Sequence, residues 1–86
     1  MAQNKVAVYP EGSNTSAPYS PGIISGGFLF VAGQVGRGPD GNVGATIEEQ
    51  TRFTIENVGR VLHAAGCDFK DVVKANVYIT KQEYFP

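Results

Sequence analysis

The chain has 86 residues, of which 42% are hydrophobic and 17% charged, with a formal net charge of −1; this composition is typical of one soluble globular domain and excludes disordered, collagen-like and coiled-coil proteins. Its seven lysines and arginines are scattered, which disfavours nucleic acid as a partner. One cysteine and one histidine exclude an internal disulfide and a zinc ligand set. With neither a secretory signal nor an apolar run of membrane length, we expect a cytoplasmic protein without membrane contact.

Strand patterns and a tight turn are predicted in the first third of the chain. Residues 5–9 alternate and include β-branched side chains, and Pro10 ends the pattern. Residues 11–21 are rich in Ser, Asn, Pro and Gly, which indicates a loop. Two apolar stretches, 23–25 and 28–32, flank a Gly-Gly pair that supplies the positive φ a hairpin turn requires. The glycine-rich stretch from Gly33 to Gly44 is predicted to be a second loop whose backbone curves closely.

A helix over residues 47–65 is the best-defined element. Thr46 and Glu49 have the spacing of a capping box, in which each side chain satisfies a free amide of the first turn. Gly66 stands where a left-handed residue ends many helices. Both ends of the helix are therefore predicted from local chemistry.

The faces of this helix follow from its spacing. Glu48–Arg52 and Glu56–Arg60 are predicted ion pairs at i, i+4 on the exposed face. Gly59 is expected to let the helix approach the sheet closely. The i, i+3, i+4, i+7 pattern predicts a buried face made of Thr51, Thr54, Ile55, Val58, Val61, Leu62 and Ala65.

Residues 68–71 are predicted to form a turn, and residues 72–80 a final strand with apolar and mixed faces. The order strand, hairpin, helix, strand predicts one α+β domain, an antiparallel-rich sheet with the helix packed on one face. Residues 28–32 are apolar on both faces, with Phe28 and Phe30 pointing one way and Leu29 the other. One helix covers only one face, and a large uncovered apolar face marks an interface. We therefore expect a homo-oligomer in which sheets pack face to face.

A series of short motifs, in order along the chain, carries a family resemblance. APYS at 17–20 and GGFLFVAGQ at 26–34 resemble "PYS … G-(hydrophobic strand)-SGQ". Residues 47–66 resemble an "EEQT … N … L … AAG" helix, and 71–74 with 77–80 resemble "DVVK … V-hydrophobic-hydrophobic-T". From about Ala17 to Phe85 the chain thus resembles the reactive intermediate deaminase family (Rid, YjgF-like), some of whose members bear the older name L-PSP endoribonuclease.

The resemblance implies an activity and an assembly. It implies a chorismate-mutase-like α+β fold in homotrimers, with small-molecule sites in the clefts between subunits. The implied reaction is hydrolysis of reactive enamines and imines, such as 2-aminoacrylate, to 2-oxo acids and ammonia, without metal or cofactor. The 86 residues would then be the N-terminal portion of a single Rid-like domain, incomplete at its C-terminus.

Two residues match family positions that bind substrate. Tyr19 matches the tyrosine that lines the cleft, and Gly33 the glycine whose backbone lies beside the substrate. Ala32 stands where many members have Ser, and Pro21 where deaminating members often have Gln, so the subgroup is open. The family's carboxylate-holding Arg and water-positioning Glu would lie beyond residue 86, so no catalytic residue is identified. The chain is then an inactive portion of an enzyme, or a diverged member.

Simpler roles compete for the other reactive residues. Tyr19 fits a cleft wall and a loop anchor about equally. His63 is expected at the surface, and Cys67 is expected to be structural, because neither has a partner in the sequence for catalysis. Residues 33–38 lack the order of a phosphate-binding motif, which favours a flexible loop. Beside the deaminase, a non-catalytic small-molecule-binding or chaperone-like trimer and an endoribonuclease remain as alternatives.

Overall fold

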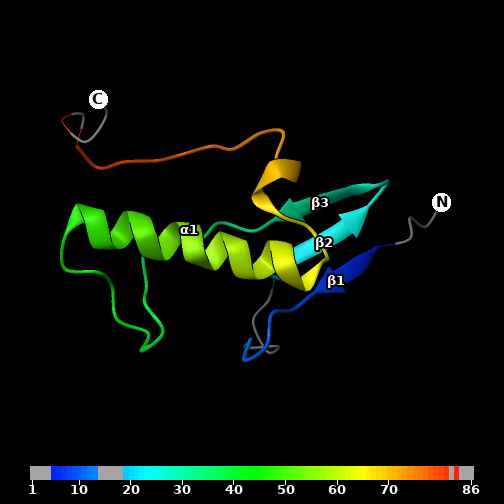
Figure 1. Cartoon of the computed structure of the whole chain (residues 1–86), viewed down its shortest axis with the longest axis horizontal. Helices are drawn as coiled ribbons and strands as arrows, with labels where there is room; N and C mark the ends of the chain where they lie inside the picture. Colours follow the sequence, from blue (N-terminus) through cyan, green and yellow to red (C-terminus); the bar gives the residue numbers. More distant parts are fainter. Residues whose placement is uncertain (1–4, 14–18, 82, 84–86) are drawn as a thin grey trace.

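The computed structural model describes residues 5–13, 19–81 and 83, and in it three short strands form one antiparallel sheet of order β1-β2-β3 (Figure 1). The strands are β1 (Val6–Val8), β2 (Gly22–Ser25) and β3 (Phe28–Val31). Gly26 and Gly27 join β2 to β3 with φ of 61° and 83°, both in the left-handed region that a tight hairpin turn requires. The predicted first strand and hairpin are confirmed. Residues 14–18 of the predicted first loop, and Phe85, lie outside the described residues.

The register gives the sheet two different faces. Val8 pairs with Gly22, and Gly22 with Val31, so these residues share the face that meets the helix. Val8, Val61 and Leu62 are the buried apolar side chains of the described residues. The core therefore lies between one face of the sheet and the C-terminal half of the helix.

Gly22 makes the close approach between strand and helix. A Cβ at this position would lie 2.8 Å from Cγ1 of Val61 and 3.2 Å from Cδ1 of Leu29, closer than packed carbon atoms stand. The prediction that Gly59 has this role is wrong. A Cβ at Gly59 would instead meet the ring of Phe69 at 3.1 Å, so Gly59 makes room for the segment after the helix.

Helix α1 (Ile47–Ala64) is confirmed, and both of its caps form. Oγ1 of Thr46 accepts a hydrogen bond from the Glu49 amide at 3.1 Å. The Glu49 carboxylate accepts from the amide of Ala45 at 2.8 Å, one residue before the position expected for a capping box. At the other end, Gly66 has φ of 78°, and the amides of Gly66 and Cys67 donate to successively earlier carbonyls, those of His63 and Leu62, in a Schellman motif.

The predicted buried face of α1 is only partly buried. Val61 and Leu62 are buried, but Thr51 is exposed and Ile55 is about half exposed. The helix has 18 residues and the strands three or four, so α1 is about 27 Å long while the strands span roughly 10 to 13 Å. The sheet is too short to cover the N-terminal half of the helix (Figure 1).

The two predicted ion pairs on the exposed face are replaced by one other ion pair and one hydrogen bond. Arg52 pairs with Glu56 at 3.9 Å rather than with Glu48, and Arg60 donates to Oδ1 of Asn57 rather than pairing with Glu56. The Arg52–Glu56 pair is largely exposed and contributes little to stability.

After the helix, η1 (Phe69–Asp71) forms the predicted turn, but the predicted strand over 72–80 does not form. Val73 and Tyr78 of this segment are 87% and 90% exposed, and the segment leads away from the sheet (Figure 1). Alternating side chains specify which face of a strand is apolar, but a strand also needs a neighbour for its amides and carbonyls. Within the described residues the sheet ends at β3, and no strand lies beside this segment.

Replacing Gly22 with Ala is expected to destabilise the fold. The new methyl group would overlap Val61, and overpacking of this kind costs about 1–3 kcal/mol. The measurement is the midpoint of urea unfolding followed by circular dichroism. Gly33→Ala is the matched control, because no atom lies within 4 Å of its Cβ position; equal midpoints for the two variants would contradict the close contact.

Candidate functional site

Tyr19 and Gly33, the two predicted substrate-binding residues, are brought to the same end of the β2–β3 ladder. The Ala32 amide donates to the Pro21 carbonyl at 2.9 Å, which extends the Gly22–Val31 pairing by one residue beyond the strands. If the same register continued by one more residue, Gly33 would lie opposite Ser20, the residue that follows Tyr19. The fold therefore gathers both residues at the end of the ladder away from the hairpin turn.

Both residues are open to solvent at this end. The Tyr19 side chain is 65% exposed, which leaves little of it to anchor a loop within this chain. The loop is tied by Tyr9 instead, whose hydroxyl lies 3.2 Å from Oγ of Ser20. Gly33 is exposed, with no atom within 4 Å of its Cβ position. A phenol and a stretch of backbone are thus both accessible at this end of the ladder.

The loop after Gly33 is more ordered than the sequence predicts. Arg37 and Val43 form an isolated antiparallel bridge, and the Gly44 amide donates to the Gly36 carbonyl at 2.8 Å. The glycines also pack on the helix, since a Cβ at Gly36 would lie 2.7 Å from backbone atoms of Gln50. The expected close curvature is confirmed, whereas the expected flexible loop is a bridged one.

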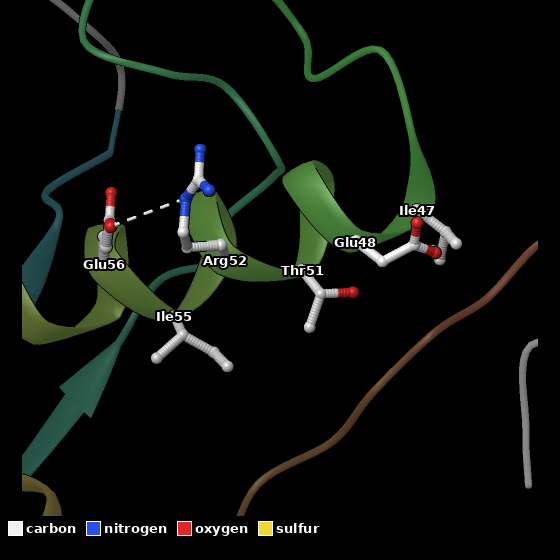
Figure 2. Close-up of a pocket in the computed structure, with 6 residues that line it drawn as sticks. All are labelled: Ile47, Glu48, Thr51, Arg52, Ile55 and Glu56. Carbon is white, nitrogen blue, oxygen red and sulfur yellow. Dashed lines mark ion pairs between the residues drawn. The ribbon is translucent and has the colours of Figure 1, made fainter.

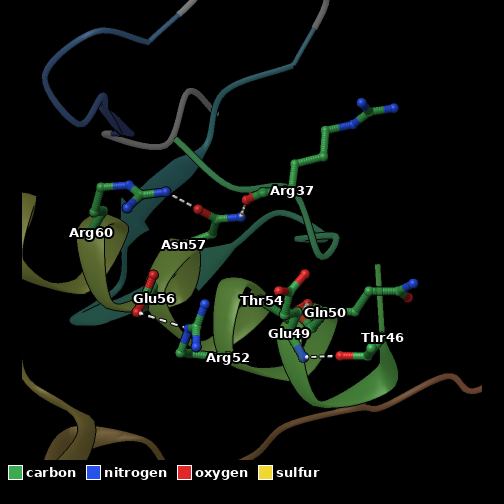
Figure 3. Close-up of polar contacts among 9 residues, drawn as sticks. All are labelled: Arg37, Thr46, Glu49, Gln50, Arg52, Thr54, Glu56, Asn57 and Arg60. Carbon is green, nitrogen blue, oxygen red and sulfur yellow. Dashed lines mark hydrogen bonds and ion pairs between the residues drawn. The ribbon is translucent and has the colours of Figure 1, made fainter. Parts of the chain in front are cut away.

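Two amide side chains of α1 attach this loop to the helix (Figure 3). Nε2 of Gln50 donates to the Gly44 carbonyl at 3.0 Å. Nδ2 of Asn57 donates to the carbonyls of Val35 and Arg37 at 2.9 and 3.0 Å. In the sequence Asn57 is only one letter of a helix motif. The helical spacing did not mark it, because its partners lie about twenty residues away.

Each arginine of the described chain already has a partner. Arg37 donates to the Gly41 carbonyl at 2.8 Å, Arg52 pairs with Glu56 and lies 5.0 Å from the Phe53 ring centre, and Arg60 donates to Asn57. A substrate carboxylate needs a cation directed at it. In the part of the chain that the structure describes, the partners of these guanidinium groups are residues other than Tyr19 and Gly33.

His63 and Cys67 occupy ordinary structural positions. Nε2 of His63 lies 3.7 Å from Oδ1 of Asp68, with both side chains more than half exposed. The Cys67 thiol is half-buried, 3.9 Å from the Ala65 carbonyl. Among the described residues no group of three or more potential ligands is placed to hold a metal ion, and no helix is long and apolar enough to cross a membrane.

Two open depressions run along α1, away from Tyr19 and Gly33. The larger, of about 580 Å³, is an apolar strip beside charged side chains of the exposed helix face (Figure 2); the second lies toward Phe69. Their charged groups are paired or solvated, so they lack convergent polar groups for chemistry. The larger is lined by Ile47, Glu48, Thr51, Arg52, Ile55 and Glu56.

Asp40, at the tip of the loop, serves the turn and is too exposed to act as a buried base. Its carboxylate accepts hydrogen bonds from the backbone amide of Asn42 at 3.0 Å and from the Asn42 side chain at 3.1 Å. The backbone bond first, and then the side-chain bond, lower the pKa of Asp40 below its ordinary 3.8, because both stabilise the charged form.

Asn42→Ala is expected to move the pKa of Asp40 part of the way back toward 3.8, since the larger effect, that of the backbone amide, remains. The pKa is followed through the carboxyl carbon by NMR titration. Because the folded-state pKa is lowered, the turn is stabilised above the unfolded-state value, and this stabilisation is lost as pH falls through the folded-state pKa. An unchanged pKa in the variant would show that the side-chain bond has no effect.

Comparisons with known proteins agree with the arrangement of sheet, loop and helix. The family model described as Endoribonuclease L-PSP matches residues 11–86. The chain is 40% identical over 83 residues to "Protein mmf2, mitochondrial" of Schizosaccharomyces pombe, covering 95% of this chain and 65% of that protein. It is 34% identical over 64 residues to 2-iminobutanoate/2-iminopropanoate deaminase of Homo sapiens, covering 72% of this chain and 47% of the deaminase.

A solved structure has the same fold. YyfA from Yersinia pestis, a protein of unknown function of the conserved Rid family, matches with a TM-score of 0.68 and 32% identity, over 77% of this chain and 55% of YyfA. The predicted α+β fold of Rid type is therefore confirmed. The chain spans about half to two thirds of the length of these relatives.

Proposed function

Because the chain belongs to the Endoribonuclease L-PSP (Rid, YjgF-like) family, we propose that it takes part in the hydrolytic deamination of reactive enamines and imines, such as 2-aminoacrylate, to 2-oxo acids and ammonia. The observation that carries the proposal is that Tyr19, two residues before Pro21, and Gly33, one residue after Ala32, both stand at the open end of the β2–β3 ladder. A relative at 34% identity is named 2-iminobutanoate/2-iminopropanoate deaminase, which supports the same substrate class.

In this proposal Tyr19 and Gly33 form one wall of the site. Imine hydrolysis adds water to the C=N carbon and then expels ammonia, so the substrate must be held still while water approaches. A phenol and an open backbone supply hydrogen bonds and an apolar surface for a small planar substrate. The cation for the carboxylate and the group that positions water come, in the proposal, from the part of the relatives' length that this chain does not span.

We also propose that copies of the chain assemble through the face of the sheet away from α1, as a homotrimer with sites in the clefts between subunits. Phe28 and Phe30 are 61% and 62% exposed on this face, with ring centres 6.4 Å apart. Ile23 pairs with Phe30 and Ser25 with Phe28, so the apolar surface continues onto β2. An exposed patch of this kind is typical of an interface.

A non-catalytic small-molecule-binding or chaperone-like trimer is the second candidate. Ala32 favours it, since the alanine supplies no hydroxyl next to Gly33. Saturable binding of a 2-oxo acid without turnover of the imine would support it. We also propose, with the deaminase, that the chain is part of a single domain and that the protein is cytoplasmic. One relative is named as mitochondrial.

An endoribonuclease is the third candidate, and it rests on the family description. The net charge of −1 opposes it, because RNA binding depends on basic residues that neutralise phosphates. Failure to retain RNA at low as well as high salt would remove it.

We expect the protein, as its gene encodes it, to speed ammonia release from the imine that a pyridoxal-phosphate-dependent dehydratase generates. Tyr19→Phe should lower kcat/KM roughly 5–10-fold, the equivalent of one hydrogen bond of about 1 kcal/mol. Tyr78→Phe is the matched control, since it removes the hydroxyl of a 90% exposed tyrosine in the segment after η1. Ammonia release no faster than with heat-denatured protein would reject the deaminase.

Phe30→Lys is expected to shift the assembly toward the monomer, because a charge in the centre of an apolar interface loses its hydration. Light scattering at micromolar concentration measures the mass. Thr51→Lys, which adds the same charge on the exposed helix face, should leave the mass unchanged. A wild-type mass of one chain would contradict the proposed interface.

A further inference from the structure

The Asn57 side chain joins the helix to the loop that follows Gly33. Its two amide hydrogens are both used, one on the Val35 carbonyl at 2.9 Å and one on the Arg37 carbonyl at 3.0 Å. Its oxygen accepts from Arg60 (Figure 3). A flipped amide would place oxygen against two carbonyls and nitrogen against a guanidinium group, so one orientation is fixed.

Among the residues that the structure describes, Gly33 depends on its neighbours in the chain for its position. It is exposed and meets no atom within 4 Å of its Cβ position. On its N-terminal side, the nearest attachment to a neighbouring segment is the Ala32 amide on the Pro21 carbonyl. On its C-terminal side, the nearest attachment is the hydrogen bond that the Asn57 side chain donates to the Val35 carbonyl. Within the described residues, the course of 33–34 is therefore set by these two attachments and by the Gln34 side chain, whose Nε2 donates to the Ala32 carbonyl at 3.1 Å.

We propose that Asn57 is a positioning residue for the substrate wall, acting through the backbone of Gly33 and Gln34. The inference rests on the proposed function, in which a small planar imine lies against Gly33. By fixing Val35 and Arg37 from the rigid helix, Asn57 holds the preceding backbone in its binding geometry before the substrate arrives. A site prepared in this way binds and orients substrate better than one that must be ordered on binding.

The role is separable from the stability of the fold. Helix α1 is closed at its two ends by Thr46 and by the Gly66 motif, and neither involves Asn57. The far part of the loop has its own bonds, from Gly44 to Gly36 and from Gln50 to Gly44. Removing the Asn57 donors thus frees the stretch next to Gly33 while the helix and the outer loop stay attached.

Asn57→Asp tests the proposal, because it keeps the shape of the side chain, removes both donors and directs a carboxylate at two carbonyls. In amide NMR spectra of the folded protein, the signals of Gly33 and Gln34 should shift and their hydrogen exchange should accelerate at least tenfold. Asn42→Asp makes the same chemical change at the loop tip, where the side chain donates to Asp40, and should leave those two signals in place. Coinciding Gly33 and Gln34 signals in N57D and wild type would overturn the proposal.

Arg60→Ala provides a second variant should N57D fail to fold. Arg60 is exposed, and its loss keeps the Asn57 donors but removes the group that fixes the amide. The Gly33 and Gln34 signals of R60A should then move from their wild-type positions. Wild-type positions for both signals in folded R60A would overturn the proposal.

The kinetic readout separates this inference from the proposed function. If the wild-type protein hydrolyses the imine, N57D should raise the apparent KM about tenfold while kcat changes less, as expected when binding geometry is lost. Wild-type kinetics in N57D would overturn the positioning role. If the wild type releases no ammonia, the deaminase proposal fails, and the Gly33 and Gln34 signals still decide whether Asn57 positions this backbone.

Discussion

The contact between Gly22 of β2 and Val61 of α1 sets how closely the helix lies on the sheet. Any side chain larger than hydrogen at residue 22 would push the helix outward and open the small core around Val8 and Leu62. The same strand leads back to Pro21, whose carbonyl holds the end of the hairpin. The contact that closes the core therefore lies on the strand that leads to the end of the ladder near Tyr19 and Gly33.

This core is small because its two layers differ in length. Helix α1 extends well beyond the three short strands (Figure 1), so only its C-terminal half is covered. The opposite face of the sheet carries exposed Phe28 and Phe30. Small domains bury a limited share of their surface, and both uncovered regions are places where further protein surface would add stability. The proposed trimer would cover the exposed face of the sheet, and the additional length of the relatives offers protein surface to cover the helix.

The loop between Gly33 and Gly44 connects the packing to the proposed chemistry. Glycines at 36 and 44 allow its backbone to touch the helix, and the amides of Gln50 and Asn57 attach it there. The helix thus has two roles, one in the core through its apolar side chains and one at the site through its amides. A deaminase and a non-catalytic binder would both use such a prepared wall. The two functions differ in the groups opposite this wall: the deaminase needs a cation for the carboxylate and a group that positions water.

By itself the sequence determined the elements whose causes are local. The Gly-Gly turn, the Thr46 cap and the Gly66 terminus each depend on residues within a few positions of one another, and all three form where predicted. The family also came from ordered motifs and is confirmed, while Tyr19 and Gly33 as site residues stay a prediction from the same motifs. The tertiary structure decided what depends on distant neighbours.

Tertiary structure placed the close glycine contact at Gly22 rather than Gly59 and left Thr51 and Ile55 uncovered. Within the described part of the chain it also left residues 72–80 without a strand partner. It also gave Asn57 its two carbonyls. Periodicity reports which side chains share a face of one element. Which surface that face meets, and whether any surface meets it, is fixed only when the layers pack.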